Sequence, residues 1–390
     1  TLLGSGLAYL FTRNVTRALS VLMVDFSCAL KLAMPLAVLS AMREASGNHV
    51  TVKGGKYLEA MAKADTIDFD KTGTLTRACP TVVAVLPVGG QNEADMLRLA
   101  ACLEEHFPHS MANAVVPAAR DRGLSHEEMH SKVDYLVAHG SASTVGEDRV
   151  IIGSAHFVFE DEGCLIPPEE QSKFDRLPNQ YTHLYLAVGG TLAAVLCISD
   201  PLRPEAKQVI QALHRLGIQK TVMLTGDSER TAAAIAAEVG VDTYRSEVLP
   251  DVKAYFVAEE QAQGHTVIML VDGINDAPAL SAADVGIAIS DGAAIAREIA
   301  DITISADGLM ELVTLRTIAT ALMKRIQSNY RFVIGFNGSL IALGTAGVLA
   351  PATSAMLHNL STLGVSLRRM TNLLAYPQDT EQPRATPDFP

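Results

Sequence analysis

Residues 66–76, TIDFDKTGTLT, decide the fold. Residues 66–69 predict a short buried strand, which runs into a polar loop at residues 70–74. Because ligands of open α/β sheets bind at the carboxyl ends of strands, Asp70 is a candidate nucleophile. The glycine and threonines after it allow a tight turn and offer N–H and hydroxyl groups to phosphate oxygens, and Lys71 adds positive charge. A polar turn without chemistry is the alternative for an isolated Asp-Lys-Thr.

The composition of the 390-residue chain favours a soluble body joined to membrane segments. The length allows two or three domains. Hydrophobic residues make up 48% of the chain and charged residues only 19%, a balance that is uncommon in a purely soluble protein. The net charge of −12 argues against nucleic acid as a partner. Five scattered cysteines without a CxxC pair favour a reducing compartment and argue against a disulfide framework.

Residues 1–45 are expected to be transmembrane. Residues 1–11 look like the tail of one span, so we expect a chain whose N-terminal part is missing. Residues 18–42 are long enough to cross about 30 Å of hydrocarbon. Their middle carries Asp25, Cys28 and Lys31, and ionisable groups at membrane depth mark ion pathways. The alternatives are a span with snorkelling charges and a buried soluble helix.

Alternating strand and helix patterns predict the domain organisation. Strand patterns lie at residues 221–224, 266–271 and 285–289, and helical patterns at 205–216, 228–239 and 252–263. Such alternation predicts a parallel, doubly wound sheet. Residues 79–199 differ, because several strands with glycine turns between them indicate an α+β body. The predicted fold class is therefore α/β, a doubly wound unit of residues 46–78 and 200–318 with residues 79–199 inserted.

Two further apolar runs predict transmembrane helices within residues 319–375. They cover residues 332–350 and 352–367. The second run carries the polar side chains His358, Asn359, Ser361 and Thr362. Basic residues flank the pair and also follow the first membrane segment, so the catalytic parts are expected in the cytoplasm and a lipid bilayer is an expected partner. Residues 376–390 are proline-rich and are expected to be disordered.

The predicted strands of the doubly wound unit end in acidic loops. These loops carry Asp70, Asp227, Asp272 and Asp276. Such loops can meet at one edge of the sheet, where their carboxylates would attract Mg²⁺. A carboxylate that attacks a phosphoryl group gives an aspartyl-phosphate, and Lys253 would neutralise the transferring charge. The P-loop sequence GxxxxGKS/T is absent, which argues against P-loop chemistry.

The motifs, in this order, resemble those of P-type ATPases over essentially the whole chain. Residues 70–76, DKTGTLT, are similar to the family's phosphorylation loop. Residues 225–227, TGD, Lys253 after Pro250, and residues 272–278, DGINDAP, are similar to its other phosphorylation motifs. Asp200-Pro201 resembles the family's DP hinge.

The resemblance implies a haloacid-dehalogenase-like phosphorylation domain with an inserted nucleotide-binding domain, and ATP and Mg²⁺ as cofactors. Asp70 would accept the γ-phosphoryl group of ATP. Asp272 and the Thr72 carbonyl would hold Mg²⁺ with Asp70. The residues implied to position phosphate and metal are Lys71, Thr72, Thr225, Gly226, Asp227, Lys253, Asn275 and Asp276. Val271 replaces the family's usual glycine, outside the ligand set.

Within the family the chain looks like the heavy-metal transporters, because two spans follow the phosphorylation domain and the inserted body is small. Residues 105–110, EHFPHS, resemble the subgroup's SEHP nucleotide motif. This resemblance implies Glu105 and His109 as nucleotide ligands, with His106 as the rival histidine. Gly140 and Gly153 resemble glycines that let the backbone approach ATP, although Ala138 replaces the first glycine of the usual GxG.

The metal motif departs from this subgroup. Residues 26–30, FSCAL, stand where CPCAL is usual, so only the Cys28 thiolate remains. The implied ligands of the transported ion are Cys28, Asp25, His358, Asn359 and Ser361, with Thr362 nearby. This mixed set suits a divalent ion such as Zn²⁺, Mn²⁺ or Cd²⁺ better than Cu⁺, which prefers several sulfurs.

The sequence lacks part of what the resemblance implies. We find no TGE loop, which the family uses to hydrolyse the phosphoenzyme, so the actuator domain and the first spans are expected upstream. Three hypotheses follow. The first is an ATP-driven metal exporter of the cell membrane. The second is a truncated membrane-bound metal-binding or regulatory protein, and the third is a soluble phosphatase of the same fold. Thr72 argues against the phosphatase, which usually has a second acid at that position.

Overall fold

The computed structural model divides the chain into two compact units. Residues 2–24, 26–77, 79–105, 112–124, 134–136, 140–178, 181–272, 276–289, 294–305, 308–368 and 370–374 are described. One unit, Ala64–Met310, holds both sheets described below and is called the α/β unit. The other, Thr1–Lys63 with Glu311–Pro390, is called the helical unit.

A parallel sheet forms the centre of the α/β unit. Its strands are β2 (Thr66–Asp70), β9 (Lys220–Leu224), β10 (Thr243–Arg245), β11 (Val267–Val271), β12 (Val285–Ile289) and β13 (Ile302–Ile304). Their order is β13-β12-β11-β2-β9-β10, and neighbours run parallel. All five residues of β2 are buried, as expected for a central strand covered on both faces.

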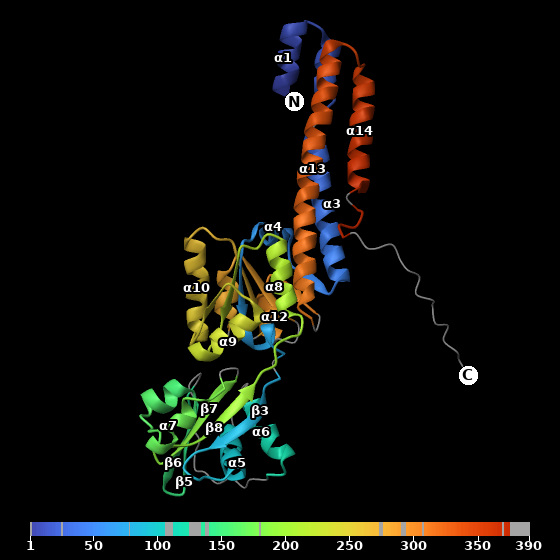
Figure 1. Cartoon of the computed structure of the whole chain (residues 1–390). Coiled ribbons are helices and arrows are strands. Elements are labelled where there is room, and N and C mark those ends of the chain that lie inside the picture. The colour runs from blue at the N-terminus through green and yellow to red at the C-terminus, as the bar shows by residue number, and fades with distance from the viewer. Residues whose placement is uncertain are drawn as a thin grey trace, which may run out of the picture. The chain divides into compact units, whose positions relative to one another are not determined.

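Helices lie on both sides of this sheet (Figure 1). They are α8 (Ala206–Arg215), α9 (Glu229–Val239), α10 (Pro250–Ala262), α11 (Ala277–Ala282) and α12 (Ala294–Ile299). Helix α8 contacts α9, whereas α10 contacts α11 and α11 contacts α12. The predicted doubly wound α/β fold is confirmed, and the strand and helix patterns expected from residue 205 onward match observed elements.

The inserted body is built on an antiparallel sheet of order β3-β8-β7-β6-β5-β4. Its strands are β3 (Thr81–Pro87), β4 (Asp134–Leu136), β5 (Gly140–Val145), β6 (Asp148–Gly153), β7 (Thr182–Val188) and β8 (Thr191–Ser199). Helices α5 (Glu93–Glu104) and α6 (Ala112–Asp121) pack their apolar side chains on one face of the sheet. The short turns η2 (His156–Asp161) and η3 (Pro168–Glu170) and helix α7 (Gln171–Phe174) complete the body.

The inserted body leaves and rejoins the parallel sheet at one place. Strands β2 and β9 are neighbours, although the whole body separates them in sequence. The outgoing and returning chains form one bridge, between Thr76 and Leu202, and Arg77 N–H donates to the Pro201 carbonyl at 3.1 Å. This paired crossing is the connection expected near residue 200.

The helical unit contains the segments predicted to be membrane spans. Its elements are α1 (Leu2–Thr12), α2 (Val15–Leu22), α3 (Phe26–Gly47), β1 (Val50–Val52), α4 (Gly55–Lys63), α13 (Met310–Ala346) and α14 (Pro351–Arg368). Within this unit α3 contacts β1 and α4, and α13 is one continuous helix. By length and hydropathy, no helix among the described residues could cross a membrane. The spans within residues 1–45 and 319–375 therefore stay predictions.

Candidate active site

Asp70 lies buried at the carboxyl end of β2 and forms an ion pair with Lys253. The Nζ atom of Lys253 is 2.6 Å from Asp70 Oδ1 and 3.0 Å from Asp276 Oδ2. Pro250 begins α10 and is compatible with its first turn, which ends at Lys253. The end of β2, the first turn of α10 and the segment with Asp276, which are distant in sequence, thus meet at the carboxyl edge of the sheet.

Burial sets the charge state of this pair. Burial raises the pKa of Asp70 to about 6, and Lys253 beside it limits the rise. Burial alone would lower the pKa of Lys253, but the carboxylates of Asp70 and Asp276 hold it above the ordinary value. Near neutral pH the site therefore has a charged lysine touching an ionised, poorly solvated carboxylate, which suits a nucleophile.

A second buried ion pair joins the turn after β2 to the loop after β9. Lys71 Nζ is 2.6 Å from Asp227 Oδ2. The same oxygen accepts a hydrogen bond from Thr225 Oγ1 at 3.0 Å, and Asp227 Oδ1 accepts one from Thr182 Oγ1 at 2.9 Å. Burial opposes ionisation, but Lys71 holds the pKa of Asp227 below its usual value. Gly226, between Thr225 and Asp227, is exposed, and a side chain there would meet only ordinary contacts.

The turn after Asp70, η1 (Lys71–Leu75), fits closely against Asp272. Gly73 has a φ of +76°, which favours glycine, and a Cβ on it would overlap the Asp272 carboxyl group. The absence of a side chain therefore lets Asp272, the first residue after β11, lie directly against the turn that follows β2.

These residues fit Mg²⁺. The Asp70 and Asp272 carboxylates and the Thr72 carbonyl are hard oxygen donors on adjoining loops, and Mg²⁺ usually takes one or two carboxylates with substrate phosphates and waters. No cluster of three or more His, Cys, Asp or Glu side chains suited to a metal was found in the part of the chain that the structure describes. Asn275 lies outside the described residues, so its role stays a prediction.

Two residues that were not predicted as part of the site, Arg203 and Asp200, form hydrogen bonds to the turn at residues 73–76. Arg203 donates from Nε to the Thr74 carbonyl at 2.9 Å and from Nη2 to the Gly73 carbonyl at 3.1 Å. Thr76 Oγ1 donates to Asp200 Oδ2 at 2.6 Å. The sequence identified Asp200 only as part of a hinge. The only feature of the sequence that pointed to Arg203 was its position three residues after Asp200.

Residues 64–284, which include this site, match the haloacid dehalogenase-like hydrolase family. The chain belongs to this family. The hydrolase match ends before α12 and covers neither the helical unit nor β13.

Curated relatives of this hydrolase are heavy-metal P-type ATPases. It is 35% identical over 378 residues to a manganese-exporting P-type ATPase of Mycobacterium tuberculosis (strain ATCC 25618 / H37Rv), covering 96% of this chain and 52% of the relative. It is 35% identical over 364 residues to a zinc-exporting P-type ATPase of Mycobacterium marinum (strain ATCC BAA-535 / M), covering 93% and 50%. The chain spans about half the length of these relatives.

Solved structures agree with this relationship. A zinc-transporting PIB-type ATPase in the E2.Pi state has a TM-score of 0.67 and 30% identity, covering 88% of this chain and 55% of that one. The catalytic domain of a CPx-ATPase has a TM-score of 0.57 and 25% identity, covering 71% and 98%. The expected membership of the heavy-metal P-type ATPase group is confirmed.

In the inserted body of the hydrolase, the two predicted glycines face each other. Gly140 and Gly153 are paired across β5 and β6. A Cβ on Gly140 would lie 2.8 Å from the Gly153 Cα and 2.7 Å from the Phe157 ring, so both strands approach closely. Their nucleotide role stays a prediction, and His109 and His106 lie outside the described residues.

A buried glutamate, Glu104, lies beside this glycine pair, whereas the predicted nucleotide role of Glu105 stays a prediction. Glu105 is exposed just after α5, whereas Glu104 is buried and accepts a hydrogen bond from Ser141 Oγ at 3.3 Å. Ser141 follows Gly140 directly, so Glu104 is the acidic residue connected to the pair. The sequence alone could not tell whether Glu104 or Glu105 faces the sheet, because the register of the helix decides this.

In the helical unit, the structure describes part of the predicted ion site. His358 Nδ1 lies 3.2 Å from Asn337 Oδ1, and both residues are buried. Ser361 Oγ donates to the His358 carbonyl at 2.8 Å, and Asn359 is exposed. Asp25 and the side chain of Cys28 lie outside the described residues. Asn337 was visible only as a polar residue in an apolar run and was not predicted as a site residue.

Proposed function

We propose that this hydrolase couples ATP hydrolysis to export of a transition-metal cation, through an aspartyl-phosphate at Asp70. The observation that carries the proposal is the Asp70 carboxylate at the end of β2, 2.6 Å from Lys253. The ion pair of Lys71 and Asp227 adjoins it. The names of the relatives, which include manganese and zinc exporters, support the transport part.

The proposed first step transfers the terminal phosphoryl group of ATP to Asp70. A carboxylate oxygen of Asp70 forms a bond to the γ-phosphorus, the bond to the β,γ-bridging oxygen breaks, and ADP leaves with that electron pair. Lys253 and Lys71 offset the negative charge that collects near the nucleophile. Water later attacks the phosphorus, which releases inorganic phosphate and restores the carboxylate.

Mg²⁺ would be held by Asp70, Asp272 and the Thr72 carbonyl, and when bound it would neutralise charge on the phosphate oxygens. Asp276, already in contact with Lys253, orients that lysine toward Asp70. Thr225, Asn275 and Asp227 complete the polar surroundings of the phosphate. The proposal gives each of these residues a role in charge neutralisation or alignment.

ATP would reach Asp70 from the inserted body. Gly140 and Gly153 have no side chains and are paired across β5 and β6, and the nucleotide is proposed to contact the exposed part of the backbone at this pair. Glu105 and His109 remain proposed contacts to the base, and Glu104 joins them because it contacts the residue after Gly140.

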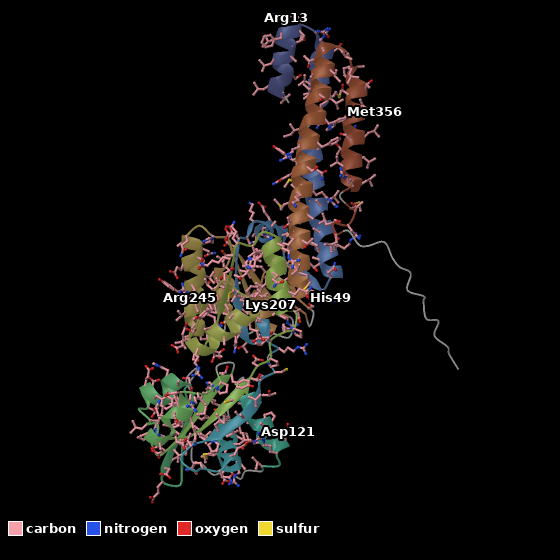
Figure 2. All side chains as sticks on the ribbon, viewed as in Figure 1. Arg13, His49, Asp121, Lys207, Arg245 and Met356 are labelled. Carbon is pink, nitrogen blue, oxygen red and sulfur yellow. The ribbon has the colours of Figure 1, made fainter. Side chains whose placement is uncertain are left out.

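We place the helical unit in the cell membrane, with the α/β unit in the cytoplasm. Large apolar side chains are exposed along its helices, as expected for lipid contact. They include Leu2, Leu3, Leu7, Leu10, Phe11, Met23, Met356, Leu360, Leu363 and Leu367, and Met356 is marked on α14 in Figure 2. An apolar surface of this extent is unusual for a soluble monomer.

The transported ion is proposed to be divalent. The Asn337 oxygen favours the His358 tautomer with its proton on Nδ1, which leaves Nε2 for a cation. Cys28, Asp25, Asn359 and Ser361 stay in the proposed set. An imidazole with oxygen ligands and one thiolate suits Zn²⁺, Mn²⁺ or Cd²⁺.

Radioactive phosphate transfer tests the proposal. Membranes containing the protein are incubated with γ-³²P ATP, Mg²⁺ and each candidate metal in turn, beside Asp70→Asn and the exposed control Asp121→Asn. We expect an acid-stable, hydroxylamine-sensitive label that depends on one metal, is lost in Asp70→Asn and persists in Asp121→Asn. Folded, ATP-binding protein that takes up no label with any metal would overturn the proposal.

A further inference from the structure

Three contacts join the inserted body to the segment that follows β9. Thr182 Oγ1 donates to Asp227 Oδ1 at 2.9 Å, and Thr231 Oγ1 donates to the Tyr181 carbonyl at 3.2 Å. Arg230 donates to the Leu177 carbonyl. All three connect residues 177–182 with residues 227–231, so a short stretch of the body rests on a short stretch of the phosphorylation domain.

The Thr182 contact differs from the other two because it ends on a carboxylate of the active site. Asp227 uses Oδ2 for Lys71 and for Thr225 Oγ1, and Oδ1 receives the Thr182 hydroxyl. Lys71 is the neighbour of Asp70 in sequence. One hydrogen bond and one ion pair therefore lead from the body to the residue beside the nucleophile.

Strand β7 extends this connection toward the glycine pair. Thr182 is the first residue of β7, and Tyr185 of the same strand pairs with Gly153 on β6. Three residues of extended chain span about 10 Å. Since hydrogen-bonded strands move together, a displacement of the Gly140–Gly153 pair carries Thr182 with it.

We propose that Thr182 is a positioning residue that couples the location of the nucleotide-binding body to the phosphorylation loop. Its hydroxyl fixes Asp227, and Asp227 fixes Lys71 beside Asp70. The inference rests on the proposed function, because it assumes that Asp70 receives phosphate from a nucleotide held by the body. Thr182 touches no reacting atom in this scheme.

Three substitutions test the coupling. Thr182→Val removes the hydroxyl and keeps the branched shape, and Thr182→Ser keeps the hydroxyl. Thr231→Val removes the hydrogen bonds of Thr231 Oγ1 to the Tyr181 carbonyl and to Ser228 Oγ, neither of which involves the Asp227 carboxylate. Each variant is measured for the rate of acyl-phosphate formation at saturating ATP and for the dissociation constant of a trinitrophenyl-ATP probe. Thermal unfolding checks that each one is folded.

We expect Thr182→Val to form the acyl-phosphate about tenfold more slowly, the scale of one hydrogen bond to a charged group. Probe affinity should change less than about twofold, since the nucleotide contacts are intact. Thr182→Ser should restore most of the rate. Thr231→Val should stay within about twofold of the unaltered protein, because a lost interface contact alone does not reach Lys71.

Equal slowing in Thr182→Val and Thr231→Val would overturn the inference, since it would indicate a general weakening of the interface. An unchanged rate in Thr182→Val, or no recovery in Thr182→Ser, would overturn it as well. Each of these outcomes is judged against unaltered protein that takes up the phosphate label, so each one contradicts the coupling and not the proposed function. An unaltered protein that binds the probe but takes up no label would overturn both, because there would be no transfer to position.

Discussion

The carboxyl edge of the parallel sheet and the glycine pair of the inserted body are built on opposite principles. At the edge, the buried Lys253 and Lys71 each lie 2.6 Å from a carboxylate. At the pair, Gly140 and Gly153 present close-packed backbone without side chains. Under the proposed function, the edge makes and breaks bonds, which requires charges fixed in a dry site, and the pair holds a nucleotide, which requires backbone that no side chain covers. The comparison indicates that the first region should be sensitive both to charge and to displacement of the charged groups, and the second to added volume alone.

The largest expected effect comes from adding volume at the charged edge. In Gly73→Ala the new Cβ would overlap the Asp272 carboxyl group, in a backbone conformation that disfavours alanine. We expect acyl-phosphate formation to slow about 100-fold, because small displacements of reacting groups cost that much. The rate at saturating ATP and Mg²⁺ measures it.

Gly90→Ala is the matched control for Gly73→Ala. Gly90 also has a φ of +76°, but a Cβ there meets nothing within 4 Å. It carries the same backbone strain without the contact. If both variants slow the reaction equally, strain accounts for the loss and the close fit to Asp272 does not matter.

The second prediction concerns the carboxylate of Asp68, which forms none of the ion pairs of the charged edge. Asp68 is buried in β2, and neither carboxylate oxygen has a hydrogen-bond partner among the described residues. Burial, with Glu260 nearby, raises the pKa of Asp68 to about 7 from 3.8. The folded state then binds more protons than the unfolded state between these values, so stability falls as pH rises through that range.

Asp68→Asn, which keeps the shape and removes the charge, should raise the free energy of unfolding at pH 8 by about 2 kcal/mol. The gain should disappear below about pH 3, where Asp68 is protonated in both the folded and the unfolded state. Denaturant unfolding at several pH values measures it, with the exposed Asp121→Asn as control. A gain independent of pH would show that the charge is not the cause.

The smallest expected effect is at the glycine pair. Gly140→Ala would push against the Gly153 backbone and the Phe157 ring. We expect the dissociation constant for trinitrophenyl-ATP to rise about tenfold, the size of one lost good contact. Phosphorylation of Asp70 by inorganic phosphate, which needs no nucleotide, should persist, slowed only by the part of the displacement that Thr182 transmits to Asp227 and Lys71. Loss of that reaction in folded protein would mean that the two regions are not separable.

The charged edge was largely predictable because its residues lie in continuous motifs. The apolar run before Asp70 and the polar turn after it identify a strand and its loop, and the later strands 221–224 and 285–289 were located correctly. Strand β5, Gly140–Val145, was missed because its small and polar residues, GSASTV, show no apolar alternation, and its pairing with β4 and β6 forms it. Tertiary pairing overrides such weak local preference.

Contacts that single side chains make with residues distant in sequence could not be predicted from the sequence. Thr182 meets Asp227 and Arg203 meets Gly73 only because the inserted body returns beside its point of exit. No local pattern marks either residue. The partnerless Asp68 was visible as a polar residue of the predicted strand, but its burial depends on which face α10 covers.

The position of β2 in the sheet has a consequence for synthesis of the chain. Its neighbours β9 and β11 follow it by about 150 residues or more, which at 5–20 residues per second takes roughly 8–30 s. The inserted body is completed first, while β2 has no partner. An unpaired apolar strand favours aggregation, and a charge within it opposes that association. Asp68, ionised in the unformed sheet, therefore protects the nascent chain at the expense of the finished fold.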